Sequence, residues 1–292
     1  MKPRQSLDWV IDVESKCEDL DFAIGGVDCW PIVRNTLLSI LAPKMTKKAS
    51  GLKHFFSRAS LFFSSLISIN LISKHKVFIL SDKKYAAEIS GAIYLKDTHV
   101  LIERARKEGL SSIVALQGEN VDENTLNHKN CFSIYAILFL AALVSKCYWL
   151  VVFFPGLSSY IDNISKNLGS VRNFEEISCS LPMIEKKIRK NIIFCFIAYK
   201  LLLSLLQRVN PERAYVVCYY SLLGMALSAA CHTLQIPLAD IQHGVAGRNM
   251  RSYSRWTSCP SNGYSTLPDL FLTWTPYDCV AIKEWAQITS KH

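Results

Sequence analysis

The sequence lacks the short motifs that identify several large classes of enzyme and metal-binding protein. No Gly-x-Gly-x-x-Gly segment follows an expected strand, which argues against a dinucleotide-dependent oxidoreductase. No Gly-x-Ser-x-Gly segment occurs, which argues against a serine hydrolase that carries its nucleophile on a strand-to-helix elbow. The ten cysteines include no Cys-x-x-Cys pair and no zinc-finger spacing, so we expect neither a structural metal nor a disulfide scaffold.

The N-terminus lacks the apolar core of a signal peptide, so no secretory leader is expected. Several cysteines lie inside apolar stretches, among them Cys195, Cys218 and Cys231, where a buried free thiol is typical. Free thiols of this kind persist in a reducing compartment. The sequence therefore predicts a cytoplasmic protein.

The composition is that of a folded protein with an excess of positive charge. Of the 292 residues, 50% are hydrophobic and 20% are charged, which is enough for one large domain or two small ones. The formal net charge is +9, and much of the excess lies in the runs Lys44 to Lys53, Lys74 to Lys76 and Lys186 to Lys190. These runs are either solvated faces or contacts for an anionic membrane surface or a phosphate-bearing substrate. Nucleic acid is not expected as a partner, because no basic run carries regularly spaced aromatic residues.

Two apolar segments stand out, at residues 55–73 and 131–155. The first is expected to be a helix in the core or on a membrane surface, and its basic leader slightly favours the membrane surface. The second is interrupted by Ser145-Lys146 and closed by Pro155-Gly156, so we expect a buried or membrane-skimming helical segment rather than a membrane span.

The remaining pattern alternates short β-rich runs with helical stretches. Residues 7–42 predict a helical entry unit with a turn at 24–31, and residues 44–54 predict a linker, which places a first segment at 1–73 and an α/β domain at 74–292. Helices are expected for a stretch that ends at Gly109, for 182–208 and 221–234, and from about Tyr277. The expected strands are 76–82, 112–116, 214–219, 237–241 and 269–274. This order predicts a parallel sheet flanked by helices.

Three of these strands end in polar residues, where ligands bind in open α/β sheets. The three ends are Ser81-Asp82, Tyr219-Tyr220-Ser221 and Gln242-His243-Gly244. The third combines an amide, an imidazole suited to proton transfer near neutral pH, and a glycine that leaves the backbone accessible. Either His243 takes part in chemistry or it only bonds a loop carbonyl.

A loop rich in aromatic and basic residues follows that strand end. It contains Arg248, Arg251, Tyr253, Arg255, Trp256 and Tyr264. Arginines next to a strand-end pocket can hold phosphate or carboxylate, and aromatic faces can stack on sugar rings or bases. The alternative is a well-packed surface loop without a ligand.

The order of these residues resembles a family of bacterial capsule and O-antigen glycosyltransferase-like proteins. The resemblance rests on Asp240-Ile241-Gln242-His243-Gly244, on Tyr253-Ser254-Arg255-Trp256, on Leu267-Pro268-Asp269 with Trp274, and on Gly25-Gly26 with Trp30-Pro31 and Arg34. It covers the start of the chain and residues 236–285, and the middle only through its strand–helix rhythm. It implies a Rossmann-like, acceptor-side domain that forms the N-terminal half of a GT-B architecture, with an added helical N-terminal unit.

The resemblance also implies roles for individual residues. His243 would be the general base that activates an acceptor hydroxyl, and Gln242 and Gly244 would shape the cleft. The further candidates for substrate binding are Arg251, Tyr253, Arg255, Trp256, Ser81 and Asp82. The reaction would transfer a sugar from a nucleotide sugar to a glycan or lipid-linked acceptor at the cytosolic membrane face. No bound cofactor and no metal is expected, because no Asp-x-Asp triplet follows any expected strand.

The sequence departs from the family pattern in two places. Asn249, Met250 and Arg251 stand where many relatives place a histidine, and the donor-binding C-terminal domain of a GT-B enzyme is not expected within the 292 residues. Two alternatives follow from this. A separate partner could supply the donor domain, or the chain could be a non-catalytic relative that acts as a glycan-binding or scaffold protein.

Overall fold

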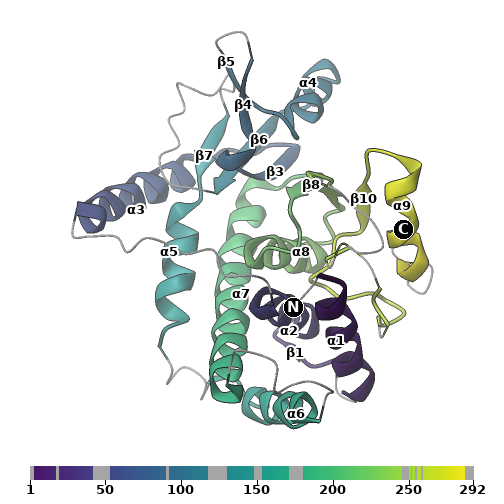
Figure 1. The fold of residues 1–292 in the computed structure, drawn as a ribbon. Helices are drawn as coiled ribbons and strands as arrows, with labels where there is room; N and C mark the ends of the chain where they lie inside the picture. Colours follow the sequence, from purple (N-terminus) through teal and green to yellow (C-terminus); the bar gives the residue numbers. More distant parts are fainter. Residues whose placement is uncertain are drawn as a thin grey trace.

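A parallel sheet of six strands forms the centre of the computed structural model, in the order β10-β9-β8-β3-β6-β7 (Figure 1). Its strands are β3 (Val77–Asp82), β6 (Ser112–Gln117), β7 (Cys131–Ser133), β8 (Arg213–Val217), β9 (Leu238–Ile241) and β10 (Leu270–Leu272). The structure describes residues 3–17, 20–41, 53–89, 92–117, 130–147, 153–170, 180–244, 250, 252–253, 255–257 and 259–286. The expected α/β class with a Rossmann-like parallel sheet is confirmed.

Five of the strands lie where the sequence predicts them, and β7 is new. The segment 131–155 was expected to be helical, but its first residues pair with β6, with Cys131 opposite Val114. Only Tyr135–Val144 forms a helix, α5, which ends before Ser145-Lys146. The expectation of one helical segment was therefore wrong at its start, because sheet pairing decides the conformation of so short an apolar run.

A hairpin between β3 and α4 (His99–Lys107) was also not expected. β4 (Ala86–Ile89) and β5 (Ala92–Leu95) pair antiparallel where the sequence predicted part of a helix. The predicted end of that helix is confirmed, because Gly109 follows α4 with a φ of +71°. The helix is thus shorter than expected, and the hairpin stands beside it at the upper end of the molecule in Figure 1.

One face of the sheet is covered by long helices. α7 (Leu181–Val209) packs against α8 (Leu222–Leu234), α5 and α2 (Trp30–Leu41), and α3 (Lys53–Leu71) packs against α5. α7 is long and apolar enough to cross a membrane by length and composition alone, but half of its most apolar window is buried inside the protein. The largest core cluster joins these helices to the side chains that the sheet presents on this face.

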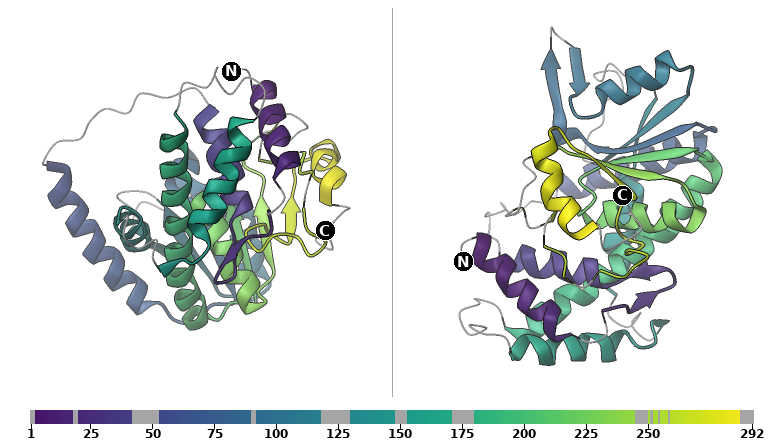
Figure 2. Two further views of the ribbon diagram at one scale, coloured as in Figure 1. Left: turned by 90° about the horizontal axis from the view of Figure 1, so that it is seen from below. Right: turned by 90° about the vertical axis from the view of Figure 1, so that its right-hand side faces the viewer.

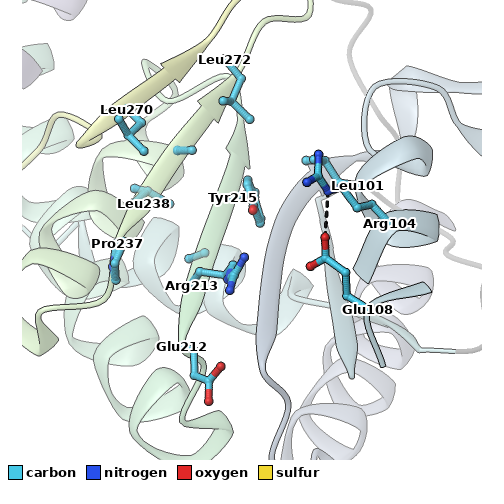
Figure 3. Close-up of a pocket in the computed structure, with 12 residues that line it drawn as sticks. Leu101, Arg104, Glu108, Glu212, Arg213, Tyr215, Pro237, Leu238, Leu270 and Leu272 are labelled. Atoms are coloured by element: carbon cyan, nitrogen blue, oxygen red, sulfur yellow. Dashed lines mark hydrogen bonds and ion pairs between the residues drawn. The ribbon is translucent and has the colours of Figure 1, made fainter. Parts of the chain in front are cut away.

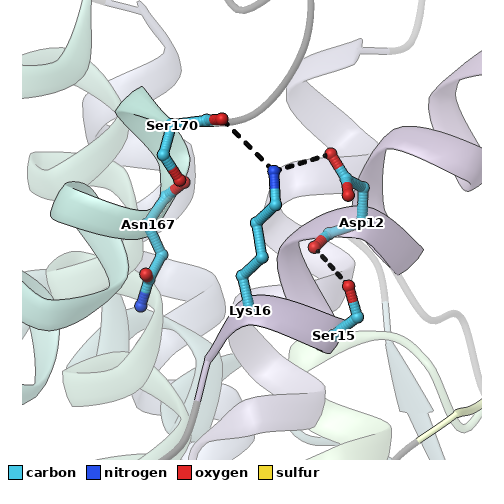
Figure 4. Close-up of polar contacts among 5 residues, drawn as sticks. All are labelled: Asp12, Ser15, Lys16, Asn167 and Ser170. Atoms are coloured by element: carbon cyan, nitrogen blue, oxygen red, sulfur yellow. Dashed lines mark hydrogen bonds and ion pairs between the residues drawn. The ribbon is translucent and has the colours of Figure 1, made fainter.

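The predicted helical N-terminal unit is present. It consists of α1 (Pro3–Lys16), a small hairpin of β1 (Ala23–Ile24) and β2 (Val27–Asp28), and α2. α1 is tied to the end of α6 (Leu157–Gly169), because the Nζ atom of Lys16 lies 3.2 Å from the carbonyl oxygen of Ser170 (Figure 4). The unit shares one hydrophobic core with α7, and the expected domain boundary after residue 73 stays a prediction. The linker expected at 44–54 falls almost wholly outside the described residues.

The second face of the sheet is only partly covered. α4 packs over β3 and β6 through Ile102 and Ala105. Over β8, β9 and β10 the same face opens into a hollow of about 560 Å³, which Figure 3 shows between Tyr215 and α4. Leu270 and Leu272 of β10 remain exposed there.

Candidate functional site

The three predicted strand ends meet at one edge of the sheet, where the order of the strands reverses. From β3 the chain adds β6 and β7 on one side, and then returns to place β8, β9 and β10 on the other. β3 and β8 are therefore neighbours at a topological switch point, the place where open α/β sheets bind ligands. Asp82 ends β3, Cys218 follows β8 and His243 lies two residues beyond β9.

His243 is paired with a tyrosine from the β8–α8 turn. The Oη atom of Tyr220 lies 3.0 Å from the Nε2 atom of His243. The ring of Tyr85, just after β3, lies 5.0 Å from the imidazole, centroid to centroid. The imidazole is thus held by residues that follow both central strands, and this arrangement differs from a histidine that only bonds a loop carbonyl.

The surroundings of His243 favour its neutral form. Burial is the largest effect and lowers the pKa of His243, the hydrogen bond to the Ile241 backbone raises it by less, and the positive charges of Lys84 and Lys96 add smaller lowering effects. Burial raises the pKa of Tyr220 far above its usual range. Tyr220 therefore stays protonated beside a neutral imidazole. In the tautomer that carries its hydrogen on Nδ1, Nε2 accepts from the Tyr220 hydroxyl, and a nitrogen without hydrogen is what a general base requires near pH 7.

The turn that carries Tyr220 is sharply folded. Cys218 has a φ of +73°, a conformation that costs free energy for any residue with a side chain. Ser221 caps α8 by accepting a hydrogen bond from the Gly224 amide at 2.9 Å. A Cβ atom at Gly224 would lie 2.6 Å from the carbonyl oxygens of Cys218 and Tyr219, so the helix approaches the turn closely only because residue 224 is glycine.

Asp240 fastens this turn from the neighbouring strand. Its buried carboxyl accepts hydrogen bonds from the Tyr219 amide at 2.9 Å and from the Tyr253 hydroxyl at 2.7 Å. Burial raises the pKa of Asp240 to about 7, although both hydrogen bonds lower it. Asp240 therefore acts on the site through the backbone of the β8–α8 turn.

The side chain of Gln242 is bonded within the loop, whereas Gly244 has no side chain to fill the site. The buried amide of Gln242 donates to the Gly244 carbonyl at 2.8 Å and accepts from the Trp274 amide at 2.7 Å. Both ends of the Gln242 side chain therefore hold the loop in place. Among the residues that the structure describes, an added Cβ at Gly244 would meet nothing within 4 Å, so these residues leave space beside its backbone.

The aromatic residues of the downstream loop are buried. Tyr253 and Trp256 are only 3% and 5% exposed. The guanidinium of Arg34 stacks on the Trp256 ring at 4.3 Å, and Arg255 forms an ion pair with Asp8 of α1. Their predicted role in substrate binding stays untested. Trp256 and Arg255 contact the N-terminal unit, whereas the Tyr253 hydroxyl donates to Asp240 of β9.

The N-terminal Trp-Pro-x-x-Arg element braces this loop. Trp30 donates from Nε1 to Glu14 at 2.9 Å, and Glu14 accepts from the hydroxyl of Thr257 at 2.7 Å. Arg34 donates to the Arg255 carbonyl at 3.3 Å. The two segments that carry the family resemblance, which are more than 200 residues apart in the sequence, therefore pack against each other.

The remaining predicted site residues fall at or near the same edge. Asp82 accepts from the Lys84 amide at 3.0 Å, and its other oxygen lies 3.3 Å from the Lys84 ammonium. Ser81 is fully buried, and its hydroxyl has no hydrogen-bond partner within the described part of the chain. Arg251 lies outside the described residues, as do Arg248 and Asn249.

Sequence reasoning ranked the histidine strand end highest and did not assign roles to Tyr220, Tyr85 or Lys84. Tyr220 lay within a named strand end, but only the pairing of β8 with β9 brings it to His243. Lys84 and Tyr85 follow β3 within three residues, so the same strand-end rule would have found them.

No group of three or more potential metal ligands occurs among the residues that the structure describes. An Asp-x-Asp triplet does occur at 19–21, ahead of β1, and its first residue lies outside the described part. Independence from a metal stays a prediction. In comparisons with known proteins, no family model, no curated protein and no solved structure matches the chain.

Proposed function

We propose that this chain forms the acceptor side of a glycosyltransferase-like protein of surface-polysaccharide synthesis. It would transfer a sugar from a nucleotide sugar to a hydroxyl of a glycan or lipid-linked acceptor. The observation that carries the proposal is the hydrogen-bonded pair of Tyr220 and a neutral His243 at the switch point of a Rossmann-like sheet. The sequence resemblance supplies the reaction class.

In this reaction the acceptor oxygen forms a bond to the anomeric carbon of the donor sugar. The bond between that carbon and the nucleotide phosphate breaks, and the nucleotide leaves with the bonding electrons. The acceptor proton must be removed as the new bond forms. Tyr220 passes its own proton to Nε2 of His243 and takes the proton of the acceptor hydroxyl, so His243 is the base and Tyr220 the relay.

Two cations act on His243, and one of them, Lys84, is also paired with Asp82. Lys84 and Lys96 both lower the pKa of His243, so both lie close enough to act electrostatically on the site. Phosphate groups of a nucleotide sugar or of a lipid-linked acceptor would complement these charges. The open space beside Gly244 gives such a ligand an approach to the backbone.

The test is transfer or donor hydrolysis with a panel of nucleotide sugars, followed by mass spectrometry. His243→Ala should lower the rate by about 10²- to 10⁴-fold, as expected for loss of general base catalysis. His232→Ala is the matched control, because it removes an exposed histidine from the last turn of α8. Full activity of His243→Ala would refute the base role.

A second candidate is a non-catalytic glycan-binding protein. It is favoured by the internal hydrogen bonds of Gln242 and by the burial of Tyr253 and Trp256. These three side chains stabilise the loop, so they are engaged in the fold and not in a reaction. Glycan binding measured by calorimetry, with no turnover of any donor and no change on His243→Ala, would favour this candidate over the first.

A further inference from the structure

A second basic site lies far along the chain from His243, between α5 and α7. A pocket of about 260 Å³ opens there, and every charged residue that lines it is basic. The lining residues are Ser145, Lys146, Lys186, Arg189, Lys190 and Ile193. The site therefore gathers four cationic side chains around one hollow.

The spacing of these residues on α7 places them on a single face. Lys186, Arg189, Lys190 and Ile193 follow the i, i+3, i+4, i+7 pattern, so they form one stripe that faces the end of α5. In a solvated basic run the like charges would point away from one another around the helix. Here they share one face of the helix, and like charges at these spacings repel one another.

The C-terminal end of α5 brings negative potential to the pocket. Lys146 follows the C-terminus of α5, where the exposed carbonyls amount to about half of an elementary charge. Arg189 also donates to the Ser158 hydroxyl at 3.2 Å, which carries no charge. The pocket therefore combines four cationic side chains with the negative end of one helix.

Exposed apolar residues lie on the same helices. Leu143 is on the last turn of α5 before Lys146, and Met183 lies one turn ahead of Lys186 on α7; both are exposed. A combination of apolar side chains with basic ones at their edge is the pattern of surfaces that lie on a lipid bilayer.

The neighbouring helix α3 carries a second group of exposed apolar residues. Phe63, Ile67 and Leu71 follow one another at intervals of four residues and are 62%, 61% and 78% exposed. α3 packs against α5 and projects from the body of the protein in Figures 1 and 2. An uncovered stripe of this kind on a protruding helix suits insertion into the headgroup region of a membrane.

We propose that the basic pocket binds the phosphate of an anionic phospholipid and, together with the exposed stripe of α3, docks the protein on a membrane surface. The occupant is a bilayer because the pocket supplies charge complementarity to lipid phosphate and the flanking helices supply apolar side chains, which a soluble anion would not need. The proposal does not rest on the proposed function, since vesicle binding requires neither donor nor acceptor.

The test is co-sedimentation of the full chain with vesicles of phosphatidylcholine alone and of phosphatidylcholine mixed with phosphatidylserine. Binding is expected only with the mixed vesicles and should weaken as salt is raised. The variant with Lys146→Gln, Lys186→Gln and Lys190→Gln should lose about fivefold in partitioning per lysine, and so about 100-fold in all. No binding to the mixed vesicles would overturn the proposal.

A matched control removes the same charge elsewhere. Lys107→Gln, Lys166→Gln and Lys283→Gln change exposed lysines on α4, α6 and α9 (Pro276–Ala286). This control should bind vesicles almost as the unchanged protein does, and circular dichroism should show that both triple variants are folded. An equal loss of vesicle binding in the control variant would mean that net charge, and not the pocket, attracts the protein to the vesicles. That result would overturn the proposal.

A third comparison separates lipid from free phosphate. Phe63→Ser combined with Ile67→Ser should weaken vesicle binding while leaving the basic pocket intact. Calorimetry with inorganic phosphate alone then tests the competing source of the anion. Tight binding of inorganic phosphate together with unchanged vesicle binding by the α3 variant would overturn the membrane assignment.

Discussion

The buried carboxyl of Asp240 should make the stability of this protein depend on pH in an unusual direction. Burial raises the pKa of Asp240 in the folded protein to about 7, whereas an aspartate in the unfolded chain titrates near about 3.9. Between these values the folded state holds the proton and the unfolded state does not. The contribution of Asp240 to stability is therefore fully present below about pH 4 and is lost as the pH rises through about 7.

The size of the effect follows from the difference between the two pKa values. About three pKa units correspond to about 4 kcal/mol of unfolding free energy. Little of this is screened, because the Asp240 carboxyl is only 1% exposed. Above pH 7 the charged carboxylate is stabilised by hydrogen bonds from the Tyr253 hydroxyl, the Tyr219 amide and the Cys218 amide.

The variant Asp240→Asn isolates this contribution. Its amide oxygen can still accept from the Tyr219 amide, but the side chain no longer titrates. Urea unfolding followed by tryptophan fluorescence from about pH 4 to about pH 8 should show the stability of the unchanged protein falling by about 4 kcal/mol relative to the variant. Asp162→Asn, at an exposed position on α6, should leave the curve unchanged. Parallel curves for the unchanged protein and Asp240→Asn would refute the reasoning.

Three further predictions concern the β8–α8 turn, His243 and the contact of Arg34 with the loop that carries Trp256. Gly224→Ala should destabilise the protein by about 1–3 kcal/mol in urea unfolding, because the new Cβ would lie 2.6 Å from two carbonyl oxygens. The control Gly169→Ala adds a Cβ that meets none of the described residues within 4 Å. His243 should titrate below its usual pKa in NMR spectra, and Lys84→Gln should raise that pKa, because the lysine charge lowers it; an unchanged value would contradict the placement of the lysine. Arg34→Met should cost about 2 kcal/mol or more through loss of the stacked guanidinium and its hydrogen bond, measured by thermal unfolding.

The fold could be predicted where the signal was local. β3, β6 and β9 are short apolar runs that end in polar residues, and Gly109 and Asn210 end helices with positive φ values. β7 and the β4–β5 hairpin could not be predicted, because strands of three or four residues carry too little periodicity to compete with a helical reading. Their conformation is decided by pairing with partners elsewhere in the fold.

The site was predictable at its centre and not at its edges. His243 follows a strand at the switch point, as the strand-end rule requires. The burial of Tyr253 and Trp256 could not be read from their neighbours in sequence. Trp256 packs against Arg34 of α2, more than 200 residues earlier, and Tyr253 packs against Tyr219 and Asp240. An aromatic and basic loop has the same composition whether it faces a ligand or a helix.

The contact of Arg34 with the loop that carries Trp256 explains how the N-terminal unit influences His243 through intermediate residues. Arg34 packs on Trp256, the same loop places the Tyr253 hydroxyl on Asp240, and Asp240 holds the turn that carries Tyr220. The residues that carry the family resemblance thus form one connected packing network. Substitutions within the network should change stability and the position of Tyr220 together, whereas substitution of His243 should change proton transfer alone. A comparison of unfolding free energy with activity across both sets therefore separates the support of the site from its chemistry.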